Sequence, residues 1–184
     1  MRYAWITAVL ALLAASPAAA RQSPPTPAAA AAADPVAGVR WIYDTVKGYL
    51  TRAADQMPEA DYAFRPTPEV RSFGQLLGHI ANAQYNYCSN VLGEQSPSRR
   101  NLEEITAKAE MVAALNASFE YCGRAYAVSD TRVMEMTQLY GGERTRLAVL
   151  EFNVAHDFEH YGNIVTYMRL KGMVPPSSQG GGDM

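Results

Sequence analysis

Apolar side chains that recur at steps of three and four residues predict two amphipathic helices in the first half of the chain. The first helix is expected over residues 36–57, between an Asp-Pro start signal and a proline that ends it. The second helix is expected over residues 72–92. It begins at Ser72, which can form a capping box with Gln75, and it ends at Gly93.

The same periodicity predicts two more helices in the second half. The third is expected from Asn101 or Thr106 to about Val128, and the fourth over residues 143–170. The fourth carries two adjoining apolar stripes, so we expect it to be buried over more than half of its circumference and to be the central helix. The connection over residues 131–142 shows no strand pattern, and neither does any other segment. The pattern therefore predicts an all-α fold, a four-helix bundle.

The amino-terminal segment MRYAWITAVLALLAASPAAA has the pattern of a secretory signal peptide. Arg2 supplies the positive charge, residues 3–15 form the apolar run, and Ala18–Ala20 supply small residues for cleavage. We therefore expect residues 1–20 to be a signal peptide and the mature protein to be secreted or periplasmic. The apolar run is short for a membrane-spanning helix, so stable membrane insertion is not expected. An uncleaved amino-terminal anchor is the alternative.

Composition divides the rest of the chain. Residues 21–35 are rich in Ala and Pro and predict a disordered linker, whereas residues 36–178 are enough for one domain with its own core. Residues 179–184 are expected to be a flexible tail. The formal net charge is −2, and only Arg99-Arg100 forms a basic pair, so binding to nucleic acid is not expected.

The chain has two cysteines, Cys88 and Cys122, on the second and third predicted helices. Export would permit a disulfide that joins these helices. The alternative is two buried free thiols that pack as small apolar groups. A metal-binding role for the cysteines is less expected, because neither has a Cys or His neighbour at ligand spacing.

The three histidines are the main candidates for chemistry. His156 and His160 are four residues apart on the fourth predicted helix, which places them on one face. His79 lies beside the apolar stripe of the second predicted helix. Each could be a buried histidine satisfied by one hydrogen bond. Three buried imidazoles are costly without partners, however, and a divalent metal would bind them in the neutral form.

Other metal-binding motifs fit the sequence less well. A di-iron carboxylate site needs two Glu-x-x-His pairs, but Leu76 stands three residues before His79 and Asp157 three residues before His160. Asp157 also replaces the glutamate of the H-E-x-x-H protease motif. Residues 156–160 match the inverted H-x-x-E-H motif, yet that match is only five residues long in a small helical chain. A peptidase is therefore not the favoured reading.

Two segments, SFGQLLGHIANAQYNYCSNVLGE and HDFEHYGNIVTYMRLKGMVPPSS, closely resemble the DinB-like family. The resemblance covers essentially the whole expected domain. It implies a four-helix bundle whose three histidines, here His79, His156 and His160, bind one divalent metal ion. Zinc or nickel is expected first, and iron or manganese are the alternatives. Some relatives are metal-dependent transferases or isomerases that use a low-molecular-weight thiol, which is scarce where an exported protein would work.

These expectations lead to a metal-dependent enzyme that acts on a small molecule by thiol-transferase or hydrolase-like chemistry. Glu159 and Asp157 are candidates for a general base, although both could equally be charged surface residues. Helper residues that could orient the histidines or a substrate are Gln75, Asn153 and Asn163.

The alternative function is a non-catalytic metal- or ligand-binding module of the cell envelope, in which the metal mainly stabilises the fold. A coordination site open to water would favour the enzyme. A site plugged by Tyr87, by Tyr161 or by a fourth protein ligand would favour the module. The sequence leaves open whether the bundle forms a homodimer.

Overall fold

The computed structural model describes residues 35–180. The expected signal peptide, all but the last residue of the expected linker, and residues 181–184 lie outside this range. None of the helices in the described part is long and apolar enough to span a membrane.

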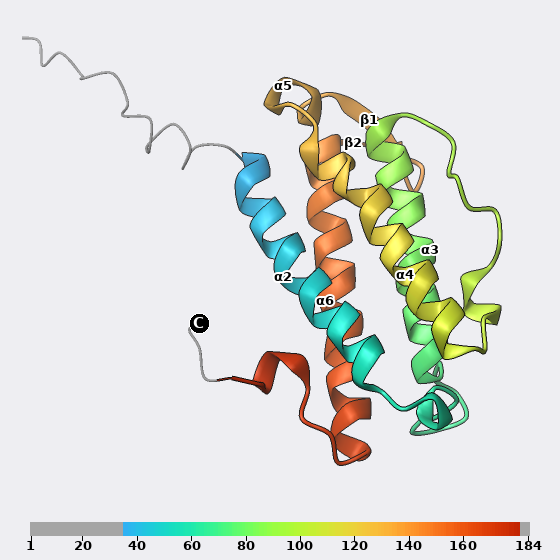
Figure 1. The fold of residues 1–184 in the computed structure, drawn as a ribbon. Coiled ribbons are helices and arrows are strands. Elements are labelled where there is room, and N and C mark those ends of the chain that lie inside the picture. The colour runs from blue at the N-terminus through green and yellow to red at the C-terminus, as the bar shows by residue number, and fades with distance from the viewer. Residues whose placement is uncertain (1–34, 181–184) are drawn as a thin grey trace, which may run out of the picture.

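Four long helices pack side by side (Figure 1). They are α2 (Pro35–Gln56), α3 (Phe73–Leu92), α4 (Lys108–Gly123) and α6 (Arg146–Leu170). α2 and α6 run in one direction, and α3 and α4 run in the other. α3 contacts both α4 and α6, and α2 contacts the same two helices from the opposite side. The long connection between α3 and α4 crosses from one end of the bundle to the other, because these helices are parallel.

Short elements connect the long helices. They comprise η1 (Glu59–Asp61), η2 (Leu102–Glu104), η3 (Ala125–Ala127), α5 (Asp130–Val133), β1 (Met136–Leu139), β2 (Gly142–Thr145) and η4 (Pro176–Ser178). The single helix expected up to Val128 is therefore shorter, with a separate 3-10 turn on either side of α4. The Asn101 side chain caps η2 by accepting a hydrogen bond from the Glu103 amide.

The expectation that the chain contains no strand is wrong. β1 and β2 form an antiparallel hairpin in which Met136 pairs with Thr145 and Leu139 with Gly142. Its strands lack a buried apolar face, and the two-residue turn is Tyr140-Gly141 rather than one of the usual Asn-Gly or Asp-Gly pairs, so the pattern carries no hairpin signal. Because residues 142–145 pair in β2, α6 begins at Arg146, three residues later than expected.

The expected ends of α3 are confirmed. The Ser72 hydroxyl accepts a hydrogen bond from the Gln75 amide, and the Gln75 side chain accepts one from the Ser72 amide. Gly93 ends the helix in the left-handed conformation with φ 73°. Together these caps satisfy backbone groups at both ends of the helix that carries His79.

A disulfide joins Cys88 of α3 to Cys122 of α4, which confirms the expected link between these helices rather than two free thiols. The Cα atoms are 5.2 Å apart, and 34 positions separate the two residues in the sequence. Nearby, Tyr126 stacks on Tyr43 of α2 with ring centroids 3.9 Å apart, and its hydroxyl donates to the Leu150 carbonyl of α6. These contacts hold the helices that face one another across the core.

Candidate metal centre

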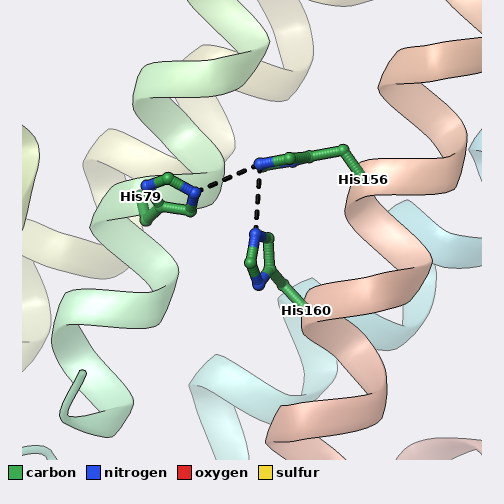
Figure 2. A group of neighbouring side chains, drawn as sticks. All are labelled: His79, His156 and His160. Carbon is green, nitrogen blue, oxygen red and sulfur yellow. Dashed lines mark hydrogen bonds between the residues drawn. The ribbon is translucent and has the colours of Figure 1, made fainter. Parts of the chain in front are cut away.

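The three histidines converge between α3 and α6 (Figure 2). The Nε2 atom of His156 lies 3.2 Å from that of His79 and 3.1 Å from that of His160. All three ligand atoms lie within 4.8 Å of one another. The four-residue step on α6 places two of them on one face, and the antiparallel packing of α3 brings the third opposite.

Their spacing fits a shared metal ion better than a hydrogen-bonded chain. An imidazole nitrogen lies about 2.0–2.1 Å from a bound zinc ion, so two ligands of a tetrahedral ion are about 3.3–3.4 Å apart. The two Nε2–Nε2 distances, 3.2 and 3.1 Å, are within about 0.3 Å of that separation. A neutral imidazole nitrogen either donates one proton or accepts, so the Nε2 of His156 cannot serve both neighbours well. A divalent cation would satisfy all three lone pairs.

The surroundings keep two of the imidazoles in the form that binds metals. Burial, together with the neighbouring His160 and His79, lowers the pKa of His156 to about 3. Burial also lowers the pKa of His160. Both rings are therefore neutral near pH 7. The Nδ1 atom of His156 is buried and has no hydrogen-bond partner among the described residues.

Glu103 is a site residue that the sequence analysis missed. Its Oε1 lies 3.0 Å from the Nδ1 of His79, and its Oε2 accepts a hydrogen bond of 2.9 Å from Arg71. Burial raises the pKa of Glu103, but the hydrogen bonds from Arg71 and His79 outweigh it and leave the pKa below its usual value. Glu103 is thus a carboxylate that accepts the Nδ1 proton of His79, which leaves the Nε2 lone pair free for a metal.

Gly78 makes this contact possible. η2 crosses α3 so closely that a Cβ at Gly78 would lie 2.5 Å from the carbonyl oxygen of Leu102. The absence of a side chain lets η2 pack on the helix backbone, and this packing places Glu103 against His79. In the sequence, only the glycine before His79 and the acidic pair Glu103-Glu104 hinted at the arrangement.

The two candidate bases lie in different environments. Asp157 is fully buried, and its Oδ2 accepts a 2.5 Å hydrogen bond from Gln84. Burial raises the pKa of Asp157 well above its usual range, and the Gln84 hydrogen bond opposes the shift. The structure therefore places Asp157 in the packed interior. Glu159 is exposed on α6, and its role as a base stays a prediction.

The three expected helper residues also differ. Gln75 caps α3 and accepts a hydrogen bond from Arg65, so it is not directed at His79. Asn153 is buried and donates to Tyr126 and Gln84. Only Asn163 approaches a histidine, with its side-chain nitrogen 3.5 Å from the Nδ1 of His160.

Two pockets border the three histidines, and Glu103 lines both. The first, about 530 Å³, adjoins His160 and is also lined by Arg71, Asn163 and Tyr167. The second, about 410 Å³, adjoins His79 and His156. A metal ion held by the three Nε2 atoms would therefore have space for a small molecule next to it.

Comparisons with known proteins agree with this fold. The chain resembles a Bacillus subtilis (strain 168) protein described as uncharacterized protein YjoA, with 23% identity over 128 residues, which cover 65% of this chain and 79% of that protein. The crystal structure of a DinB-like protein from Bacillus cereus superposes with a TM-score of 0.68 at 14% identity, covering 76% of this chain and 94% of that one. That similarity concerns the fold alone.

The family comparison is more direct. Residues 42–164 match the model of the DinB superfamily. This segment includes most of α2, all of α3 and α4, and all three histidines of the cluster. The chain belongs to the DinB superfamily.

Proposed function

We propose that this protein is a metal-dependent enzyme that acts on a small molecule outside the cytoplasm. It holds one divalent metal ion through His79, His156 and His160, with zinc or nickel as the first candidates and iron or manganese as alternatives. The observation that carries the proposal is the convergence of three Nε2 atoms at a point bordered by two pockets. Three protein ligands and adjoining space are typical of catalytic rather than structural zinc sites.

The bound metal would supply a Lewis acid that polarises a substrate and activates water or a thiol. Residues of this chain orient the histidines and keep them neutral. Glu103 holds the Nδ1 proton of His79 and thereby fixes the ring orientation. Burial keeps His156 and His160 neutral. Asn163 lies beside the Nδ1 of His160 in the first pocket, where its amide can orient either that ring or a substrate.

The disulfide bears on the compartment and on the reaction. Disulfides persist in oxidising compartments, so the Cys88–Cys122 bond supports export of the mature protein. Reduced low-molecular-weight thiols are scarce there. Hydrolase-like chemistry is accordingly the preferred reaction class, and thiol transfer is the second.

The second candidate function is the non-catalytic module, and the contacts of two tyrosines argue against it. The Tyr161 hydroxyl donates a hydrogen bond to the Ser177 hydroxyl, and the Tyr87 hydroxyl lies 2.6 Å from the Tyr140 hydroxyl. Both hydroxyls are therefore engaged elsewhere and do not plug the three-histidine site. This favours open coordination positions, which an enzyme needs and a structural site does not.

Cobalt(II) substitution tests this difference. The mature chain is loaded with Co²⁺, and its visible spectrum is recorded as azide is added. A spectral change that saturates with azide, and that a substrate of the enzyme reverses by displacing the azide, supports the enzyme. Hydrolysis of a panel of small esters and amides, measured with and without added thiol, then identifies the reaction class. A cobalt spectrum that azide leaves unchanged would contradict the enzyme and favour the module.

A further inference from the structure

The hairpin β1–β2 places an aromatic side chain at the second pocket. Tyr140 occupies its two-residue turn. Together with Tyr87 of α3 and Phe152 of α6, it lines this pocket. Ring centroids are 5.5 Å apart between Tyr87 and Phe152 and 5.9 Å apart between Tyr140 and Phe152, in edge-to-face arrangements. We call these three side chains the aromatic wall.

The aromatic wall adjoins the candidate metal ligands. On α6, Phe152 is one helical turn before His156, and on α3, Tyr87 is about two turns after His79, with Ala83 between them. The Tyr87 ring also packs against the His156 ring, with centroids 5.6 Å apart. Because Ala83 has only a methyl side chain, the space between the two helices stays open at this level.

The local backbone does not favour a tyrosine at the turn. Tyr140 has φ 51°, a left-handed conformation that bulky residues rarely adopt and that Gly or Asn would accept more easily. Tyr140 is 73% exposed, so it adds little to the core. Phe152 is 46% exposed and forms the opposite edge of the pocket. Exposed aromatic rings gathered at a pocket are typical of binding sites.

Contacts between the hairpin and α3 hold Tyr140 in place. The Thr137 hydroxyl donates to the Asn90 side chain, and the Asn90 amide donates to the Gln138 carbonyl. The hydroxyls of Tyr140 and Tyr87 are 2.6 Å apart. The ring at the turn is thus fixed against the helix that carries His79, as a binding surface requires.

We propose that the aromatic wall of Tyr87, Tyr140 and Phe152 is a substrate subsite that binds a planar aromatic group, while a polar group on the same small molecule reaches the metal centre. This inference rests on the proposed function and names its substrate class. Edge-to-face and stacked contacts with three rings favour an aryl group over a saturated group of similar size. The exposed Asn86 amide, at the margin of the same pocket, can bind a polar substituent on the ring.

The test uses three probes that share one metal-binding group. The probes are benzohydroxamate, cyclohexanecarbohydroxamate and acetohydroxamate, and each is titrated into the zinc-loaded mature chain by calorimetry. The association constant of each probe for the protein is then divided by its association constant for Zn²⁺ in solution. We expect benzohydroxamate to bind about tenfold or more tightly than acetohydroxamate, with the cyclohexyl probe between them, because aromatic contacts add to simple apolar burial.

Variants assign the preference to the aromatic wall. Tyr140→Gly and Phe152→Ala should each reduce the preference for benzohydroxamate about fivefold, with no change for acetohydroxamate. Tyr140→Phe, which keeps the ring, and Val70→Ala, which alters only the first pocket, should retain it. Tyr140→Gly relieves the positive φ but also removes the hydroxyl contact to Tyr87 and the ring contact to Phe152, so acetohydroxamate, which is too small to reach the aromatic wall, serves as the control for an intact metal centre. A merely structural tyrosine would change the affinities for all three probes alike.

Two results would overturn the inference in different ways. Equal corrected affinities for the three probes, or a full preference retained in Tyr140→Gly, would refute the aromatic subsite and leave the metal centre standing. If none of the probes binds the zinc-loaded chain, the coordination sphere is closed, and both the proposed function and this inference are wrong.

Discussion

Replacing Gly78 with alanine tests how η2 positions Glu103. The added Cβ would lie 2.5 Å from the carbonyl oxygen of Leu102 and 2.7 Å from the amide nitrogen of Glu103. Both are backbone atoms, so no side chain can rotate away to make room. η2 must move by roughly 1 Å to restore ordinary van der Waals contact. That movement withdraws the Glu103 carboxylate from the Nδ1 of His79.

Two opposing effects set the magnitude. Overpacking costs about 1–3 kcal/mol, whereas alanine in a helix interior is about 0.5–1 kcal/mol more favourable than glycine. We expect Gly78→Ala to lower the free energy of unfolding by about 1–2 kcal/mol. Loss of the partner that orients His79 should also weaken zinc binding about tenfold or more.

The assay is urea denaturation of the metal-free protein, combined with zinc affinity measured by competition with a coloured chelator. Gly48→Ala is the matched control, because Gly48 is also inside a long helix and its Cβ would meet no atom within 4 Å. We expect this control to gain about 0.5–1 kcal/mol and to keep its zinc affinity. If Gly78→Ala behaves like Gly48→Ala in both measurements, the close approach of η2 does not position Glu103.

Three further changes have defined outcomes. Replacing Cys88 and Cys122 together with serine should lower the free energy of unfolding by about 4 kcal/mol, because the disulfide closes a loop with a sequence separation of 34. Urea denaturation measures this loss, and a loss below about 1 kcal/mol would contradict the expectation. Glu103→Gln, which keeps the shape of the side chain, should weaken zinc binding about tenfold or more in the chelator competition, and unchanged affinity would remove Glu103 from the site. The pKa of His156 is lowered from 6.5 to about 3 in the folded protein, so between these two pH values the unfolded chain takes up this proton and the folded chain does not. Metal-free wild type should therefore lose stability relative to His156→Gln as the pH falls from 6.5 toward 3; parallel urea midpoints would show that the pKa is not lowered.

Periodicity and capping predicted the long helices because these depend on neighbours in the sequence. Ser72, Gln75 and Gly93 fix the ends of α3 through contacts within a few residues, and the structure confirms them. The expectation that the fourth helix is the central one is wrong, because 10 of the 25 residues of α6 are buried against 13 of the 20 residues of α3, which packs against α4, α6 and η2. The four-residue step between His156 and His160 is equally local, so their shared face could be read from the chain.

Features that depend on tertiary contacts could not be predicted. Glu103 reaches His79 from a separate 3-10 turn, because Gly78 admits the backbone of η2. The hairpin has no buried face and an unusual Tyr-Gly turn, and its position depends on hydrogen bonds to Asn90. Asp157 sits beside His156 in the sequence, but the helix turns it into the interior. Proximity along the chain therefore predicted the shared face of His156 and His160 but not the contact of His79 with Glu103.

The metal content of the mature chain tests the central claim most directly. The protein, beginning at Arg21 and purified without an affinity tag, is analysed for metals beside His156→Ala and the control Trp41→Ala, an exposed residue of α2. We expect about one divalent metal ion per chain in the wild type and the control, and none in His156→Ala. No metal in the wild type after incubation with zinc, nickel, manganese and ferrous iron, or a full complement in His156→Ala, would contradict the three-histidine metal centre.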